Sequence, residues 1–395
     1  MHRLGLPALP AFIVLYGAMY AAFGVASPFW PLFFESRGVS PEQLGLLLAV
    51  GTLARLLAGP LFGRIADMVG LRAVLAGCTA LAVVAALGLL PAHGFLLLLA
   101  VSVCHGAALT PVTTIADALS LHAATRGPGR AFEYGWVRGA GSAAFVLGTL
   151  LAGHVLGRGM DISALVWLHA AFLAGAVAAT PLVPGILPAP TERSVEARFL
   201  ISGLREALRN PALRKVIAMA ALIFGSHAMH DAFAAIRWNA AGLSPMTISI
   251  LWSEAVAAEV LVFFVVGPFA LNRIGPRGAA TLAAIAGVVR WIVMSQTTDL
   301  AALALVQPLH GLTFALLHLA CMRVLGAVVP PQLAATAQAI YAFGAAIASA
   351  ILSYVSGRLY GEFGATGFLA MAGLCALALP LSLAMPSKRS LVTSR

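Results

Sequence analysis

The sequence predicts an all-α membrane protein with twelve transmembrane helices. Only 10% of the 395 residues are charged, while 61% are hydrophobic and a further 39 residues are glycine. Soluble domains carry about 25% charged residues, and a disordered chain would lack this many apolar side chains. Helices are expected rather than strands because an open strand in lipid would leave its backbone groups unpaired. The lipid bilayer is therefore the expected main solvent.

The length of the apolar stretches and the residues that interrupt them predict the bounds of the individual spans. A helix needs about 20 residues to cross a hydrocarbon core of about 30 Å, and Pro, Gly and clusters of charge mark where each span ends. The twelve predicted spans are 8–34, 42–66, 71–91, 94–120, 134–157, 163–185, 214–239, 247–271, 277–298, 300–328, 333–358 and 365–386.

The net charge of +10 is distributed unevenly around these spans. With both termini in the cytoplasm, most of the Lys and Arg residues outside the spans fall in cytoplasmic segments, which is the positive-inside pattern. This pattern explains the positive charge without nucleic acid as a partner. It predicts an integral protein of the bacterial cytoplasmic (inner) membrane with both termini inside.

One long connection divides the spans six and six. Residues 186–213 begin rich in Pro and continue with alternating Arg and Glu, which predicts a cytoplasmic linker between six-helix bundles at 1–185 and 214–395. The halves resemble each other at an offset of about 205 residues. The paired segments are RGVSPEQLG and AGLSPMTIS, DMVGLR and NRIGPR, and the His-Gly pairs at 105 and 310. Such a duplication in a membrane protein is typical of a transporter with its site at the repeat interface.

The loop after the second span, GRIADMVGLR, is the most specific short motif. Its glycines allow a tight cytoplasmic turn, and Asp67 is placed to meet the positive end of a neighbouring helix. Gly63, Asp67, Gly70 and Arg72 match the signature of the major facilitator superfamily, although two usually basic positions are apolar here. The resemblance implies two pseudo-symmetric six-helix bundles, the major facilitator fold, with this motif as a gating loop. The alternative is a plain turn with a solvated charge.

Three polar residues fall at similar depth in the eighth, ninth and tenth spans, namely Glu259, Arg290 and His310. At 1.5 Å per residue they lie roughly 15–20 Å inside the membrane, so they can meet at one level. Intramembrane charges are costly and are functional by default, and a desolvated carboxylate near a guanidinium can switch between charged and neutral forms. The trio predicts a proton relay. The alternative is a permanent ion pair of Glu259 with Arg290 that only ties helices together.

Other intramembrane polar residues leave two interpretations open. Asp117 and Arg138 lie toward the cytoplasmic side of adjacent spans, where they can form a structural bridge or hold substrate. Asp231 is accompanied by His227 and His230, which are either functional or ordinary packing residues. No spacing resembles a zinc site, a phosphate-binding loop or a nucleophile triad. No metal, cofactor or enzymatic activity is therefore expected.

Segments around these residues carry a closer resemblance. In the same order along the chain, FEYGWVRGAGSAAF, HDAF, AAEVLVFF, LNRIGPR, VVRW and LHGLTF resemble the lactose permease and the phenylpropionate permease group of proton symporters. The segment SPFWPLFFESRG is closer to the phenylpropionate group. The resemblance places Glu259, Arg290 and His310 at proton-coupling positions. It places Arg138 at a substrate-binding arginine and Asp231 at a buried charge-pair aspartate.

Departures from the lactose permease narrow the expected substrate. The carboxylate that follows its relay histidine is Thr313 here, its sugar-stacking Trp is Phe145, and its sugar-binding Glu falls near Thr113 or Thr114. Sugar hydroxyls are usually held by carboxylates and an aromatic platform, so a disaccharide is not expected. Aromatic side chains that suit a flat substrate remain, and the candidates are Phe29, Trp30, Phe33, Phe145, Trp252, Trp291 and Tyr341.

Together these patterns predict a monomeric, proton-coupled symporter that moves a small organic solute by alternating access, with an aromatic monocarboxylate such as a phenylpropionate as substrate. Glu259 carries the proton, and Arg290 and His310 tune it. The expected substrate-binding residues are Arg138, Asp117, Phe145, Asp231, Trp30 and Trp252. The alternatives are a nucleoside or sugar proton symporter, a drug exporter of the same fold, or a transport-dead membrane sensor or scaffold.

Overall fold

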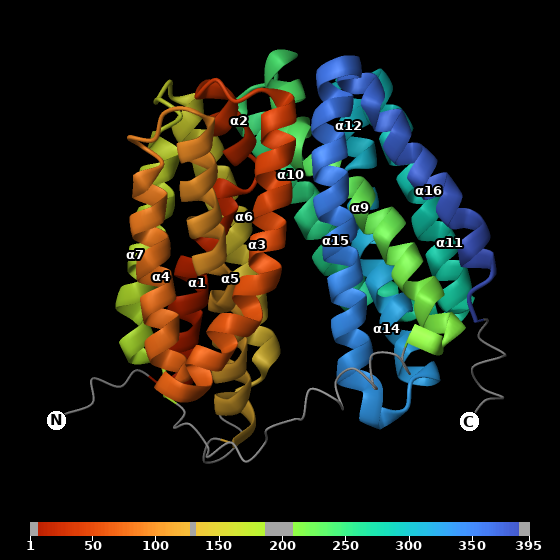
Figure 1. Ribbon diagram of the computed structural model, residues 1–395, viewed down its shortest axis with the longest axis horizontal. Helices are drawn as coiled ribbons and strands as arrows, with labels where there is room; N and C mark the ends of the chain where they lie inside the picture. Colours follow the sequence, from red (N-terminus) through yellow and green to blue (C-terminus); the bar gives the residue numbers. More distant parts are fainter. Residues whose placement is uncertain (1–6, 127–131, 186–207, 387–395) are drawn as a thin grey trace. The chain divides into compact units, whose positions relative to one another are not determined.

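The structure is a computed structural model that describes residues 7–126, 132–185 and 208–386. These residues form helices and turns and include no β-strand (Figure 1). Ten helical runs among them are long and apolar enough to cross a membrane. Two of these runs, Pro245–Gln296 and Ala334–Leu383, are 52 and 50 residues long. The predicted all-α membrane fold is confirmed, and the number of twelve spans stays a prediction.

The chain separates into two compact units. Unit 1 comprises residues 1–43, 50–192 and 242–250, and unit 2 comprises 44–49, 193–241 and 251–395. Most of the predicted linker at 186–213 lies outside the described residues, so its role stays a prediction. The described part of that segment, 208–213, includes Asn210, whose side-chain oxygen accepts from the backbone N–H groups of Ala212 and Leu213 and so caps the next helix.

Unit 1 is a helical bundle. Its helices are α1 (Ala8–Ala26), α2 (Trp30–Ser36), α3 (Pro41–Val69, of which 44–49 belong to unit 2), α4 (Leu71–Gly88), α5 (Phe95–Arg126), α6 (Tyr134–Gly157) and α7 (Ala164–Ala179), followed by the short helix η1 (Thr180–Leu182). The predicted span at 8–34 is broken between α1 and α2. Pro28 lies in this break, where a helix would lose a backbone donor and clash with the proline ring.

Glycines set the approach of α6 to α1. A Cβ atom on Gly24 would collide with the carbonyl of Phe145, and one on Gly148 would collide with the backbone of Ala21. The Thr149 hydroxyl also donates to the Gly24 carbonyl over 2.9 Å. Because α6 carries Arg138, this close backbone contact determines where that guanidinium lies within unit 1.

Unit 2 contains more interrupted helices. They are α9 (Pro211–Ala240), α10 (Pro245–Leu261, of which the first turns belong to unit 1), η2 (Val262–Val266), α11 (Gly267–Gln296), α12 (Leu300–Val306), α13 (Leu309–Gly311), η3 (Leu312–Leu316), α14 (Leu317–Val328), η4 (Pro331–Leu333), α15 (Ala334–Phe363), η5 (Gly364–Gly367) and α16 (Phe368–Leu383). Gly275 has a φ of 71° and kinks α11, between the predicted spans 247–271 and 277–298.

Two segments of unit 2, η2 and η3, are π-helical. The first begins three residues after Glu259 and the second two residues after His310. They pack near each other because Gly311 brings its helix against the carbonyl of Ala258. Single π-helical turns are frequent at functional sites. The predicted tenth span, 300–328, is consequently broken, with a further interruption at Gln307 and Pro308.

The repeated motifs of the sequence adopt repeated geometry. Gly70 and Gly275 both have positive φ, 105° and 71°. Arg72 donates to the Val183 carbonyl over 3.3 Å at the end of unit 1's last helix. Its counterpart Arg277 donates to the Met385 carbonyl over 3.0 Å after α16. Each half therefore closes its last helix with the arginine of the same motif, which supports an internal duplication.

Replacing Gly148 by Ala is expected to lower the free energy of unfolding by about 1–3 kcal/mol, because the new methyl group must displace the α1 backbone. The matched control is Gly139→Ala on the same helix, where a Cβ meets open space and a helical Gly→Ala change stabilises by about 0.5–1 kcal/mol. Thermal unfolding of the purified protein in detergent measures both. Equal midpoints for the two variants would contradict the close contact.

Candidate functional site

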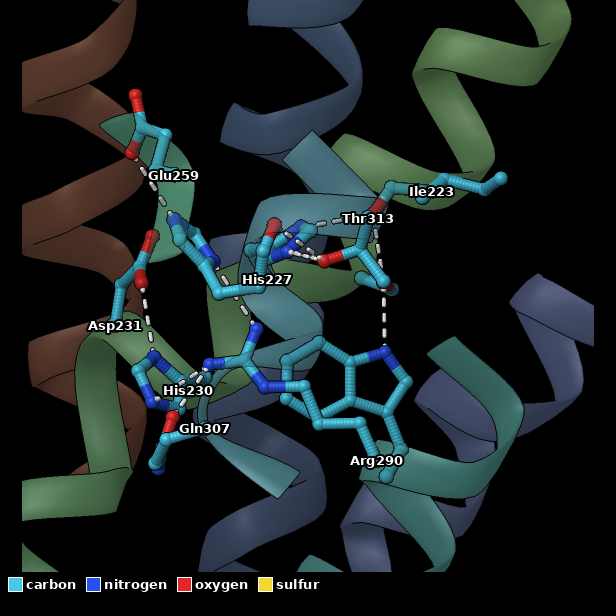
Figure 2. Close-up of polar contacts among 11 residues, drawn as sticks. Ile223, His227, His230, Asp231, Glu259, Arg290, Gln307 and Thr313 are labelled. Carbon is cyan, nitrogen blue, oxygen red and sulfur yellow. Dashed lines mark hydrogen bonds and ion pairs between the residues drawn. The ribbon is translucent and has the colours of Figure 1, made fainter. Parts of the chain in front are cut away.

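Two clusters of polar side chains, one in each unit, contain predicted site residues. The Arg290 cluster of unit 2 consists of Glu259, His310, Arg290, His230 and Asp231, with Gln307 beside the guanidinium (Figure 2). The Arg138 cluster of unit 1 consists of Arg138, Asp117, Tyr16 and Tyr20. The first cluster contains the predicted proton relay, and the second contains the predicted substrate arginine.

Arg290 lies at the centre of its cluster and is fully buried. Its Nη1 donates to Nδ1 of His310 over 3.1 Å. Its Nη2 donates to Oε1 of Gln307 over 2.8 Å and to Nε2 of His230 over 3.3 Å. Its Cζ lies 4.6 Å from the ring centroid of Trp291, within cation–π range. The charge is thus surrounded by neutral acceptors and one aromatic face.

The arginine decides which nitrogen of each imidazole carries hydrogen. A guanidinium has only donors, so the nitrogen that faces it must accept. His310 therefore carries its hydrogen on Nε2, which lies 3.4 Å from Oε2 of Glu259. His230 carries its hydrogen on Nδ1, which lies 3.2 Å from Oδ1 of Asp231. Each carboxylate is consequently linked to Arg290 through a neutral imidazole rather than by a direct ion pair.

A second layer of contacts holds these imidazoles in place. Trp252 stacks on His230 with a centroid distance of 4.9 Å and an interplanar angle of 24°. His227 donates from Nδ1 to the Ile223 carbonyl over 2.9 Å, and its Nε2 lies 2.9 Å from the Thr313 hydroxyl. The Thr313 oxygen also lies 3.2 Å from the carbonyl of His310. Thr313 therefore links His227 of α9 to the backbone of His310.

In the Arg138 cluster the guanidinium and the carboxylate meet directly. Nη1 of Arg138 lies 3.4 Å from Oδ1 of Asp117 and donates to the Tyr20 hydroxyl over 2.5 Å. The Tyr16 hydroxyl donates to the same Asp117 oxygen. The two tyrosine rings stack at 5.7 Å, and a Cβ on Gly141 would press on both of them. The cluster is partly open, since the Arg138 and Asp117 side chains are 41% and 36% exposed.

The remaining predicted substrate residues are dispersed. Asp231 and Trp252 belong to the Arg290 cluster. Trp30 lies on α2 against the imidazoles of His105 and His169, whose Nε2 atoms are 3.0 Å apart. Phe145 follows Arg138 on α6, and its backbone carbonyl packs against Gly24 of α1. The structure thus brings together Arg138 and Asp117 from the predicted set, with the others placed elsewhere.

The gating-loop residues lie at the junction of α3 and α4. Gly63 and Asp67 are in the last turns of α3, Gly70 is the turn residue, and Arg72 is in the first turn of α4. Asp67 is exposed, and no hydrogen bond joins its side chain to any other residue that the structure describes. Its expected contact with a helix end stays a prediction.

Several residues of both clusters were not predicted from the sequence. Tyr16 and Tyr20 are four residues apart on the first span, a spacing that places them on one helix face and was the available signal. Gln307 precedes His310 by three residues, but the helix is interrupted between them, so spacing alone could not align them. Within the described part of the chain no group of three or more His, Cys, Asp or Glu side chains is arranged to hold a metal ion.

Comparisons with known proteins agree with this architecture. The sequence model of the MFS_1 like family matches residues 11–370. The probable 3-phenylpropionic acid transporter of Escherichia coli (strain K12) is 33% identical over 367 residues, covering 90% of this chain and 92% of that protein.

Solved structures are similar at lower identity. The nucleoside transporter NupG has a TM-score of 0.83 at 16% identity, covering 98% of this chain and 99% of its own. An inward-facing, unoccupied bacterial homologue of the human lysosomal transporter Spinster has a TM-score of 0.73 at 14% identity, covering 98% of each chain. These two likenesses concern the fold alone.

Replacing Gln307 by Leu is expected to cost about 1–3 kcal/mol of unfolding free energy, because a buried donor of Arg290 loses its acceptor. Gln296→Leu is the matched control, since Gln296 is exposed at the end of α11 and its side chain bonds only to neighbouring Ser295 among the described residues. Denaturation of both purified variants gives the comparison. A Gln307→Leu protein as stable as the control would show that Arg290 does not depend on this amide.

Proposed function

Since the chain belongs to the MFS_1 like family, and is therefore a major facilitator transporter and not an enzyme, we propose that it takes up an aromatic monocarboxylate together with protons. The substrate class is that of the phenylpropionates. Positive residues on one side of the spans further support a place in the bacterial inner membrane with both termini in the cytoplasm. The proton is the coupling ion in this proposal, and a single chain suffices for transport.

The observation that carries the proton coupling is the contact of Glu259 with His310 and of His310 with Arg290. Glu259 is partly accessible, with 26% of its side chain exposed, whereas Arg290 is fully buried. A carboxylate in this position can take a proton from water while its charge remains coupled to the guanidinium through the imidazole. Glu259 carries the proton, and His310 and Arg290 adjust its binding.

The substrate assignment rests on the Arg138 cluster and on the relative named for 3-phenylpropionic acid. Among the described residues, the hydrogen bonds of Arg138 to Tyr20 and Asp117 all come from Nη1. A guanidinium has five N–H donors, so Nη2 and Nε can receive a carboxylate as a charge-assisted pair. The ring of Tyr20 packs edge-on against Phe23 at 5.5 Å, which offers apolar surface for an aryl group.

Uptake by purified protein in liposomes tests the proposal. An imposed pH gradient, acidic outside, is expected to drive accumulation of 3-phenylpropionate, and a protonophore should abolish it. Galactosides and uridine are measured in parallel. Gradient-driven entry of either, with no entry of phenylpropionate, would replace the aromatic acid by a sugar or a nucleoside. Absence of entry for every solute would favour a sensor or scaffold.

Replacing Glu259 by Gln fixes the neutral form of the side chain. Accumulation driven by a pH gradient is expected to fall to the equilibrium level, while exchange of labelled for unlabelled substrate continues, because exchange needs no net proton movement. Glu254→Gln, one and a half turns earlier on α10, is the control and should accumulate substrate normally. Normal accumulation by the Glu259 variant would place the coupling carboxyl elsewhere.

Replacing Arg138 by Lys keeps the charge but removes the planar fork of donors. The dissociation constant for phenylpropionate is expected to rise at least about tenfold, which corresponds to losing one charge-assisted hydrogen bond. Binding of the corresponding amide should hardly change. Arg158→Lys, at the exposed end of α6, serves as the control in calorimetric titrations. Equal losses for acid and amide would mean that Arg138 supports the fold rather than the carboxylate.

A further inference from the structure

The Arg290 cluster is a continuous chain with a carboxylate at each end. Asp231 bonds to His230, His230 to Arg290, Arg290 to His310, and His310 to Glu259. Figure 2 shows Asp231 and Glu259 on the same side of the network, each joined to an imidazole. The proposed proton relay uses only the Glu259 half of this chain. The Asp231 half repeats the same order of groups.

The Arg290 cluster contains two carboxyl groups but only one guanidinium. With both carboxylates ionised and both imidazoles neutral, two negative charges share the one guanidinium. One added proton makes the cluster neutral, which is favoured around a guanidinium that has no exposed surface. Neither imidazole can take this proton, because each already accepts a hydrogen bond from Arg290 and would then turn a donor toward a donor. The proton must therefore reside on a carboxyl group.

We propose that Asp231 is a second protonation site, so that one proton occupies either Asp231 or Glu259 but not both. Protonation forms an O–H bond on the carboxyl with a proton drawn from water, and no electron transfer is involved. The two protonation sites are coupled. When one carboxyl is ionised, its negative charge balances that of Arg290, and the other carboxyl is then favoured in its protonated, neutral form. That this proton is the transported one rests on the proposed function.

Exposure favours Asp231 as a protonation site that exchanges with water. Its side chain is 60% exposed, while His230 is 4% exposed. Protons do not pass from one protonation site to the other through Arg290, because a guanidinium does not release protons in proteins. Each protonation site therefore exchanges protons at its own end of the chain. The cluster therefore has two protonation sites for one proton, and these sites influence each other only electrostatically.

Other titratable groups lie near the two carboxylates of this network. Among the described residues Asp231 interacts electrostatically with His227, His310 and Arg290. His227 is occupied by the Ile223 carbonyl and the Thr313 hydroxyl. The packed helices add Cys375 on α16, Cys321 and His318 on α14, and Tyr341 and Tyr360 on α15, and of these His318 interacts electrostatically with Glu259.

Infrared difference spectroscopy of the full chain in detergent, without substrate, tests the proposal by the stretching band of protonated carboxyl groups. At neutral pH the parent protein is expected to show a band that disappears on alkalinisation. Asp231→Asn should remove it as completely as Glu259→Gln, since either change leaves one carboxylate to balance Arg290. Glu362→Gln, an exposed carboxylate at the end of α15, should keep the band.

Two results would overturn the inference. One is an Asp231→Asn protein that keeps the parent's band while Glu259→Gln loses it, because Glu259 alone would then hold the proton. The other is a parent protein with no such band at neutral pH. Asp231→Glu, which preserves the charge, should retain the band and separates loss of the proton from loss of the fold. The band needs no substrate, so failure of gradient-driven uptake would reject the proposed transport without deciding this point.

Discussion

A fully buried guanidinium organises the second unit. Arg290 has no exposed surface, and an unpartnered charge in that position would be strongly destabilising. Its two terminal nitrogens donate to two imidazoles and an amide oxygen, and its face lies over the ring of Trp291, while its buried Nε has no hydrogen-bond partner among the described residues. Because the imidazoles must accept from it, their outward nitrogens carry hydrogen and turn toward Glu259 and Asp231. The orientation of every titratable group in the cluster follows from this one buried charge.

The two polar clusters differ in how an intramembrane arginine is related to the carboxylates near it. Arg138 pairs directly with Asp117 in a partly exposed position, where tyrosine hydroxyls complete the contacts. Arg290 is separated from its carboxylates by imidazoles in a buried position. A direct, open pair suits a group that exchanges partners with a ligand. An indirect network around a buried guanidinium suits a group whose charge must respond to protonation without giving up its own hydrogen bonds.

Local irregularities of the backbone and small residues position the side chains of these clusters. The two π-helical segments follow Glu259 and His310, and Gly311 allows their helices to approach closely. In unit 1, Gly24 and Gly148 let α1 and α6 meet backbone to backbone, and Gly141 leaves room for the tyrosine rings. Small residues are the usual means of close helix packing in membranes, where no hydrophobic force drives helices together. The polar groups are thus positioned by glycines that carry no chemistry themselves.

The sequence by itself determined the helical membrane fold, the duplication of turn motifs and the meeting of Glu259, Arg290 and His310, because hydropathy, glycine turns and helical rise are local properties. Only the tertiary structure decided that His310 lies between the two charges, that Asp231 and Trp252 join them, and that Tyr16 and Tyr20 serve Arg138. These outcomes depend on helix rotation and on breaks such as that at Gln307 and Pro308. Side-chain direction after such a break is set by packing against other helices, which spacing along one helix does not encode.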